Sequence, residues 1–217
     1  MALEIAGKVG PQTLSDGVTQ TLRLGKQGDA IASLLHGVYY EQAVRKQTFS
    51  LALTATSSTI AAGNINAAAA AASTQFALWN PLTSGVNLVL LKAWIGAISG
   101  TPPVAGCFHN VMTTVPTIAS VGTAYNNYIG GVGPAAKYVA SAAGTTLTGG
   151  GALVVVRPMA YTLFAGAVAA TTGIAPTLEI LDGDIILPPG TGWVPCWTAA
   201  GTTFLNSYGV SWEEVPV

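Results

Sequence analysis

Apolar and polar residues alternate along much of the chain, in short runs separated by glycine and proline. Residues 48–56 show the alternation clearly, with Phe49, Leu51 and Leu53 on one side. Period two is typical of a strand with one buried face, because successive side chains point to opposite sides of a sheet. The same pattern predicts further strands at residues 18–24, 31–35, 74–80, 86–98, 108–115, 137–140, 152–164, 177–181, 185–187, 193–198 and 203–212. Many short strands between turn residues predict an all-β sandwich or barrel.

Two details refine this prediction. Residues 187–193, LPPGTGW, indicate a corner, because two prolines cannot donate to a sheet and two glycines supply turn conformations. Trp193 begins the next strand, and Pro195 predicts an edge strand or a bulge. Residues 65–73, INAAAAAAS, are the one stretch that favours a short helix, with an extended alanine-rich strand as the alternative.

Charged residues are scarce: 17 of 217 residues, or 8%, against about 25% in an ordinary soluble domain. A chain of this mass exposes about 9,300 Å² as a compact monomer, which leaves about one charge per 550 Å². We therefore expect neighbouring subunits to cover much of the surface. The net charge of −1 argues against nucleic acid as a main partner. No uninterrupted apolar run reaches the roughly 18 residues of a membrane-spanning helix, so no membrane partner is expected.

The charges are also unevenly placed. Nine of the 17 lie in residues 1–46, and no aspartate or glutamate occurs from residue 42 to residue 178. This predicts a charged N-terminal arm, residues 1–46, and a nearly neutral body, residues 47–217. Mixed charges give register and specificity at interfaces, so we expect the arm to dock on a neighbouring protein. A solvated arm is the alternative.

No catalytic constellation is evident. His109 lies in the acid-free span, so any acid that oriented it as a base would have to come from far away in the sequence. We therefore expect His109 to be a surface or interface histidine, and His36 to be a turn residue. The chain carries no nucleophile elbow, zinc-protease, phosphate-loop or dinucleotide fingerprint. The sequence predicts no enzyme and no cofactor.

Glu179, Asp182 and Asp184 form the best candidate for a cation site. Closely spaced carboxylates around a glycine can bind Ca²⁺ through oxygen ligands. The sequence Asp182-Gly183 is also a strong turn signal by itself. We expect the turn, with no metal.

Residues 16–49, DGVTQTLRLGKQGDAIASLLHGVYYEQAVRKQTF, resemble the N-terminal region of structural proteins from tailed bacteriophages and related environmental viruses. The body is similar, through its alanine, glycine and threonine content and its ending ILPPGTGW…SWEEVPV, to jelly-roll modules of virion decoration proteins. The positions that match the arm are Asp16, Gly17, Leu22, Arg23, Leu24, Gly25, Gly28, Gly37, Tyr39, Tyr40, Glu41 and Phe49.

The resemblance implies a jelly-roll β-sandwich with an extended N-terminal arm and at most one short helix. It also implies a virion structural protein, most simply a capsid decoration or cement protein that binds the particle as a homotrimer. The expected partners are copies of itself and the major capsid protein or another virion protein. The candidate interface residues of the arm are Arg23, Lys26, Tyr39, Tyr40, Glu41 and Arg45. Assembly in the host cytoplasm favours free, buried thiols at Cys107 and Cys196 over a disulfide.

A host-recognition module that binds glycans is the alternative function. Residues 125–128, YNNY, are the one stretch that suits a sugar, because aromatic rings and amides lie together there. An ordinary polar loop with two packing tyrosines is the competing interpretation.

Overall fold

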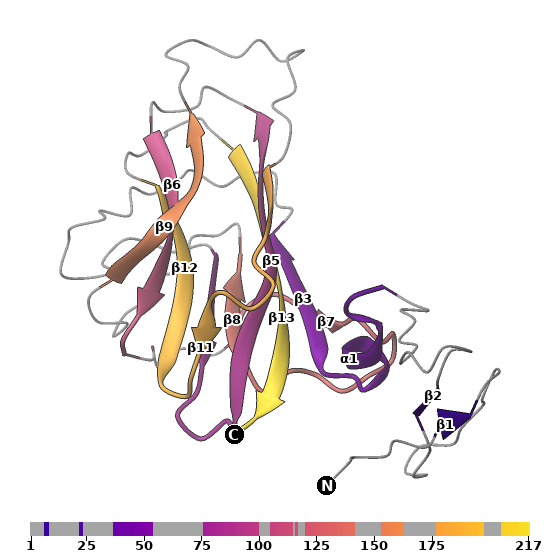
Figure 1. Ribbon diagram of the computed structural model, residues 1–217. Helices are drawn as coiled ribbons and strands as arrows, with labels where there is room; N and C mark the ends of the chain where they lie inside the picture. Colours follow the sequence, from indigo (N-terminus) through magenta and orange to yellow (C-terminus); the bar gives the residue numbers. More distant parts are fainter. Residues whose placement is uncertain are drawn as a thin grey trace, which may run out of the picture. The chain divides into compact units, whose positions relative to one another are not determined.

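The computed structural model describes residues 7–8, 22–23, 37–53, 76–99, 105–114, 116, 120–141, 153–162, 177–197 and 205–217. The chain forms two compact units, Met1–Tyr40 and Glu41–Val217. In the first unit, β1 (Gly7–Lys8) and β2 (Leu22–Arg23) pair in parallel. The second unit is a β-sandwich (Figure 1). The alanine-rich stretch 65–73 and the predicted strand 31–35 lie outside the described residues.

The sandwich confirms the all-β prediction, and α1 (Tyr40–Val44) is the one helix among the described residues. Every strand predicted for the body is present. The structure adds one that was not predicted, β7, a three-residue strand that overlaps the stretch for which a polar loop was the competing interpretation. The strands of the sandwich are β3 (Thr48–Leu53), β4 (Phe76–Asn80), β5 (Val86–Ser99), β6 (Ala105–Met112), β7 (Ala124–Asn126), β8 (Lys137–Ala140), β9 (Leu153–Thr162), β10 (Thr177–Ile180), β11 (Ile186–Leu187), β12 (Thr191–Trp197) and β13 (Leu205–Pro216).

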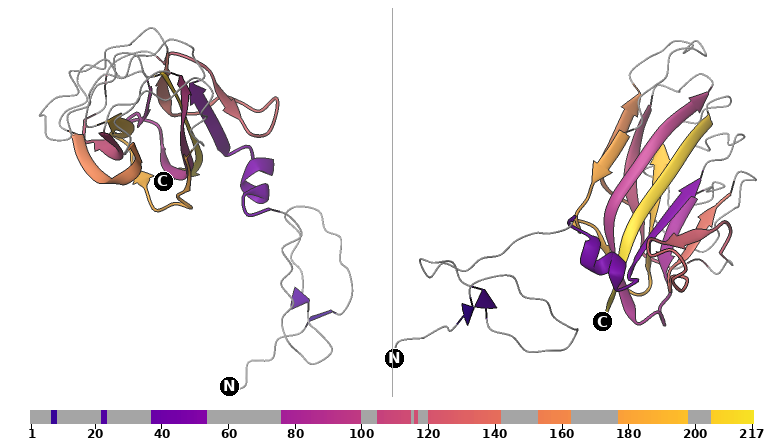
Figure 2. Two further views of the ribbon diagram at one scale, coloured as in Figure 1. Left: turned by 90° about the horizontal axis from the view of Figure 1, so that it is seen from above. Right: turned by 90° about the vertical axis from the view of Figure 1, so that its right-hand side faces the viewer.

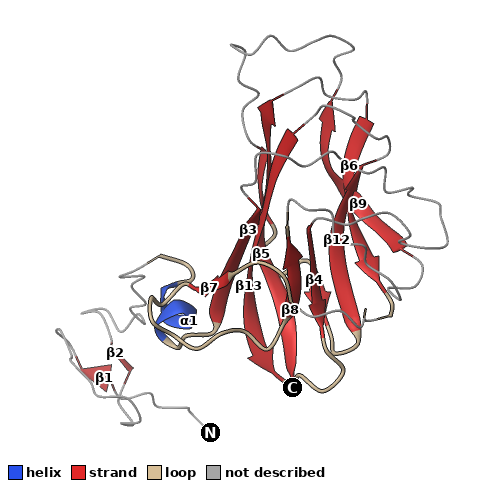
Figure 3. Cartoon of the chain, turned by 180° about the vertical axis from the view of Figure 1, so that it is seen from behind, coloured by secondary structure: helices blue, strands red, loops and turns tan. Residues whose placement is uncertain are grey.

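These strands form two antiparallel sheets that face each other (Figure 3). One has the order β10-β5-β13-β3-β7, with β11 also paired to β5, and is called the β13 sheet below. The other has the order β8-β4-β12-β6-β9 and is called the β12 sheet. Figure 2 shows the two layers from the side and from above.

The strand pairing is nested. β3 pairs with β13, β4 with β12, β5 with β10, and β6 with β9, so the second half of the body pairs with the first half in reverse order. A long antiparallel hairpin rolled into two sheets in this way has the topology of a jelly roll. β7 and β8 lie between β6 and β9 in the chain and add one strand to each sheet.

The core lies between the sheets and is rich in aromatic residues. The Phe76 ring meets Trp193 edge-on at 6.1 Å and stacks with Tyr208 at 5.9 Å. Phe49 stacks with Trp212 at 5.7 Å. Such ring pairs contribute about 0.5–1.5 kcal/mol beyond the apolar area they bury. Period two places the aromatic side chains of β13, Tyr208 and Trp212, on this inner face.

The LPPGTGW corner connects β11 to β12. Gly190 has a φ of 87°, which few other residues adopt, and its N–H donates to the Asn80 carbonyl at 2.9 Å. Pro195 was predicted to mark an edge strand or a bulge; β12 is an interior strand of its sheet, but at Pro195 it pairs on one side only, with β6. Pro195 is tolerated there because the ladder between β12 and β4 ends at Trp193. Within the described residues, no helix is both long and apolar enough to cross a membrane.

Candidate interaction surface and a buried polar bridge

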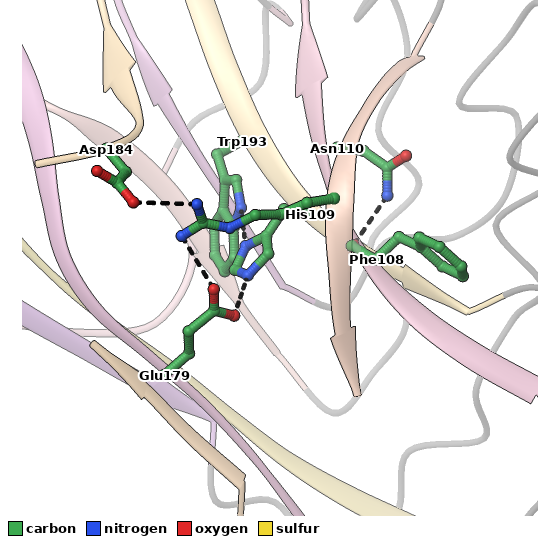
Figure 4. Close-up of polar contacts among 7 residues, drawn as sticks. Phe108, His109, Asn110, Glu179, Asp184 and Trp193 are labelled. Carbon is green, nitrogen blue, oxygen red and sulfur yellow. Dashed lines mark hydrogen bonds and ion pairs between the residues drawn. The ribbon is translucent and has the colours of Figure 1, made fainter. Parts of the chain in front are cut away.

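Ionic and polar side chains bridge the two sheets where β9 and β10 lie near each other (Figure 4). His109 on β6 contacts Glu179 on β10, with 2.7 Å between Nε2 and Oε2. Arg157 on β9 reaches the other oxygen of Glu179 at 2.9 Å and Asp184 at 3.1 Å. Trp193 donates its indole N–H to His109 Nδ1 at 3.0 Å. The prediction that His109 lies at a surface or interface is wrong, because its side chain is 0% exposed.

The bridge fixes the state of His109. Because Trp193 donates to Nδ1, the imidazole carries its proton on Nε2 and donates it to Glu179. Burial lowers the pKa of His109, while the hydrogen bond to Glu179 works in the opposite direction. Both ring nitrogens are occupied, so neither is available to take a proton from a substrate. A histidine oriented by a carboxylate supplies two of the three members of a catalytic triad, yet here the pair links the two sheets.

The three carboxylates of the candidate cation site are separated by the fold. Arg157 lies between Glu179 and Asp184, and its hydrogen bond to Asp184 raises its pKa above the usual value. Asp182 and Gly183 occupy the turn after β10, both with positive φ, and Asp184 N–H donates to the Leu181 carbonyl at 2.9 Å. This is the predicted Asp-Gly turn. In the described part of the chain, no three His, Cys, Asp or Glu residues gather as a metal site.

The bridge also sets the orientation of β10. Glu179 points inward to His109, so its neighbours Leu178 and Ile180 point outward. They are 58% and 61% exposed. Ile186 on β11 is 54% exposed, while the next residue, Leu187, is buried. A one-residue shift of register would bury the two β10 aliphatics, with a gain of about 2–4 kcal/mol at the usual value per buried side chain. The polar bridge excludes that register.

The outward side chains of the β13 sheet form a single face, which we call the outer face. Across the strands, Leu178 is paired with Trp94, Trp94 with Gly209, and Gly209 with Ala52. The next row contains Ile180, Lys92, Ser211, Ser50 and Tyr125. Large aliphatic residues therefore stand along β10 and β11, and small residues lie along β13 and β3.

Trp94 lies between these two parts of the outer face. A Cβ on Gly209 would overlap the Trp94 indole, so the ring lies directly on the glycine backbone. Gly209 is needed for this close approach and not for an unusual φ. The glycine thus lets the partly buried indole lie flat on the outer face.

The two cysteines are free, as predicted. Cys107 belongs to the core between the sheets, and Cys196 belongs to a separate buried cluster on the other side of the β12 sheet. Burial raises the pKa of Cys196 to about 12 and raises that of Cys107 as well. Their side chains lie on opposite faces of one sheet, and both thiols stay protonated at neutral pH.

The predicted interface residues of the arm are distributed over both units. Arg23 lies in β2, Lys26 lies outside the described residues, and Tyr39 precedes α1. Tyr40 begins α1, and its side chain is exposed. Glu41 and Arg45 form an exposed ion pair with each other across one helical turn, at 3.0 Å. Both belong to the compact unit of the sandwich, and an exposed pair of this kind contributes about 0.3–0.5 kcal/mol.

The loop of the YNNY stretch is held by its own amides. Asn126 is buried, and its side-chain NH₂ donates to the carbonyls of Lys46 and Val132, at 2.8 and 3.1 Å. Asn127 accepts from the Ser50 hydroxyl at 2.8 Å. Tyr125 and Tyr128 remain 65% and 45% exposed. The aromatic part of the predicted sugar site is therefore accessible, while both amides are engaged in structural contacts.

A second anchor attaches the same loop to β13. The Glu214 carboxylate accepts from the backbone N–H groups of Ala135 and Ala136, at 2.9 and 3.0 Å. The Trp212 indole donates to it at 3.3 Å. This buried carboxylate connects the last strand to the segment before β8.

Sequence reasoning did not find the outer face. Its residues were assigned to strands, but alternation in the short strand Leu178-Glu179-Ile180 predicts the aliphatic side inward. The sequence held one hint, Arg157, a cation on another predicted strand. An ion pair with Arg157 is what allows Glu179 to point inward.

Comparisons with known proteins identify no relative. No protein-family model matches the chain, and neither a curated protein nor a solved structure is similar to it.

Proposed function

We propose that the chain is a non-enzymatic structural subunit of a virus particle, a decoration or cement protein that binds the particle surface as a homotrimer. The observation that carries the proposal is the outer face. It exposes Leu178, Ile180 and Ile186 on a body with very few charges. Exposed apolar faces of this kind are typical of proteins that assemble.

Two further observations support a virion rather than another assembly. Residues 16–49 resemble the arm of phage structural proteins, and the jelly-roll fold is common in viral capsid domains. The fold alone does not determine a function, because lectin domains use it as well. The virion function therefore rests on the arm together with the assembling face.

Oligomeric state and particle binding test the proposal together. The full chain should sediment as a trimer at micromolar concentration and should bind particles that lack it. Deletion of residues 1–40 should leave a folded trimer that no longer binds the particle. The deletion ends at residue 40 because Lys46 contacts Asn126 and Tyr128 of the sandwich. A stable monomer, or a truncated chain that still binds fully, would contradict the proposal.

The glycan-binding alternative has one observation in its favour, the exposed rings of Tyr125 and Tyr128. Sugars stack on such rings. A glycan array probed with the full chain and with Tyr125→Ala separates the two functions. Saturable binding that the substitution removes would favour host recognition, and no binding to any glycan would leave particle decoration as the function.

A further inference from the structure

We infer that the outer face of the β13 sheet is the contact between copies of this chain, where the aliphatic ridge of one copy packs on the small-residue floor of the next. The ridge is Leu178, Ile180 and Ile186, and the floor is formed by Ser50 and Ala52 beside the Trp94 indole, which itself covers Gly209. The inference rests on the proposed function, which requires a trimer, and it adds where the subunits meet.

The first argument is the inverted polarity of β10. The strand turns its carboxylate inward and two aliphatic side chains outward, against the tendency of an isolated sandwich. The inward carboxylate of Glu179 contacts His109 and Arg157, so its polar partners come from the chain itself. A partner that covers the aliphatic side completes the arrangement.

The second argument is charge. On the outer face, the described ionisable side chains are Lys92, Glu213 and the phenol of Tyr125. Arg45, whose charge acts on Glu213, is itself paired with Glu41, so positive and negative charges balance there. A nucleic acid would need a cluster of cations, which this face lacks. A second copy presents the same balanced surface, and one lysine and one glutamate can approach each other across the contact.

The third argument is shape. The ridge and the floor are different patches on one face, and Trp94 on Gly209 lies at their boundary. Contacts between two different patches are head-to-tail, and head-to-tail contacts close into rings when the rotation allows. Ridge-to-floor packing therefore fits a cyclic trimer.

The test is a pair of matched double substitutions in the full chain. Leu178→Lys with Ile180→Lys charges the ridge and leaves Glu179 in place. Ile129→Lys with Val132→Lys is the control, because those side chains are 86% and 75% exposed in the loop after β7, outside the outer face. Light scattering should show a monomer for the ridge variant and the wild-type trimer for the control. Circular dichroism should report the same β-content for all three proteins.

A labelling experiment gives an independent readout. Cys107 and Cys196 are buried, so an added thiol is the reactive one. Ala52→Cys places it on the floor, and Thr83→Cys places it on an exposed turn. In the assembled protein, a maleimide should modify position 52 at least tenfold more slowly than position 83. The protection should disappear in the ridge variant.

The outcomes separate the two proposals. A wild-type chain that stays monomeric overturns the trimer of the proposed function, and with it this contact. A wild-type trimer that the ridge variant does not dissociate overturns the contact alone. If the ridge variant does not fold, labelling in the wild-type background decides, and equal rates at positions 52 and 83 overturn the contact.

Discussion

The outward sides of the two sheets differ in how they are covered. On the β12 sheet, Trp79, Met112 and Val194 face away from the central core and are almost wholly buried in a second apolar cluster. On the β13 sheet, Leu178 and Ile180 face away from the core and are mostly exposed. Outward-facing apolar residues therefore have two different roles in this fold. On the first sheet they belong to the interior of the chain, and on the second they are available to a partner.

The largest effect should come from truncating the buried outward side. Trp79→Ala should lower the free energy of unfolding by about 3–5 kcal/mol, because it leaves a cavity. Leu178→Ala should cost about 0.5 kcal/mol or less when the chain is dilute enough to be monomeric. Urea denaturation of both variants checks this. Equal costs would show that the two outward sides do not differ in burial.

An inward and an outward glutamate on β13 make a second comparison. Glu214→Gln should cost about 1–3 kcal/mol, because an amide has only one oxygen to accept from the N–H groups of Ala135 and Ala136. Glu213→Gln is the control, since Glu213 points to the outer face and burial raises its pKa. It should leave stability within about 0.5 kcal/mol. Denaturant unfolding at pH 7 measures both, and a larger loss for Glu213→Gln would refute the assignment.

The third comparison is the cost of adding one methyl group to a glycine in each sheet. On β12, a Cβ on Gly192 would overlap Met112 and lie 2.9 Å from Trp79 Cβ. Gly192→Ala should cost about 1–3 kcal/mol, as overpacking of a core does. Gly209→Ala should cost about 1 kcal/mol or less, because the Trp94 indole can move into solvent. Thermal unfolding gives the costs, and a red shift of tryptophan emission only in Gly209→Ala would identify the displaced ring.

The smallest expected effect is the dependence of stability on pH. Burial holds the pKa of His109 below its unfolded value of about 6.5, so the unfolded chain binds the proton more readily. Stability should therefore be complete above pH 6.5 and fall as the pH decreases below it, by at most about 1.4 kcal/mol per unit from this residue. The fall ends once the pH passes below the folded pKa.

Substitution of the buried histidine isolates this contribution. His109→Gln should weaken the dependence of stability on pH below pH 6.5, compared with the wild-type chain. Denaturant midpoints across that range provide the measurement. An unchanged slope in His109→Gln would mean that other groups produce it.

The sequence predicted the strands well, because glycine and proline mark the turns and alternation marks the faces. Contacts between residues that are distant in the sequence were harder to predict. His109 was expected at a surface because its acid, Glu179, lies 70 residues further along the chain. β7 was missed because its three residues, in a polar stretch, carry too little pattern. The orientation of β10 was beyond local reasoning, because one ionic contact across the sandwich outweighs the burial of two aliphatic side chains.

The nested pairing has a consequence for synthesis on the ribosome. β13 is the middle strand of its sheet and pairs with β3 and β5, which are made more than a hundred residues earlier. Until residues 205–216 emerge, β3 and β5 lack the strand that lies between them in the folded sheet. Long-range pairing of this kind makes folding slow. The sandwich therefore completes late in translation, and an interrupted chain is left without the strand that supplies Gly209 and seats Trp94.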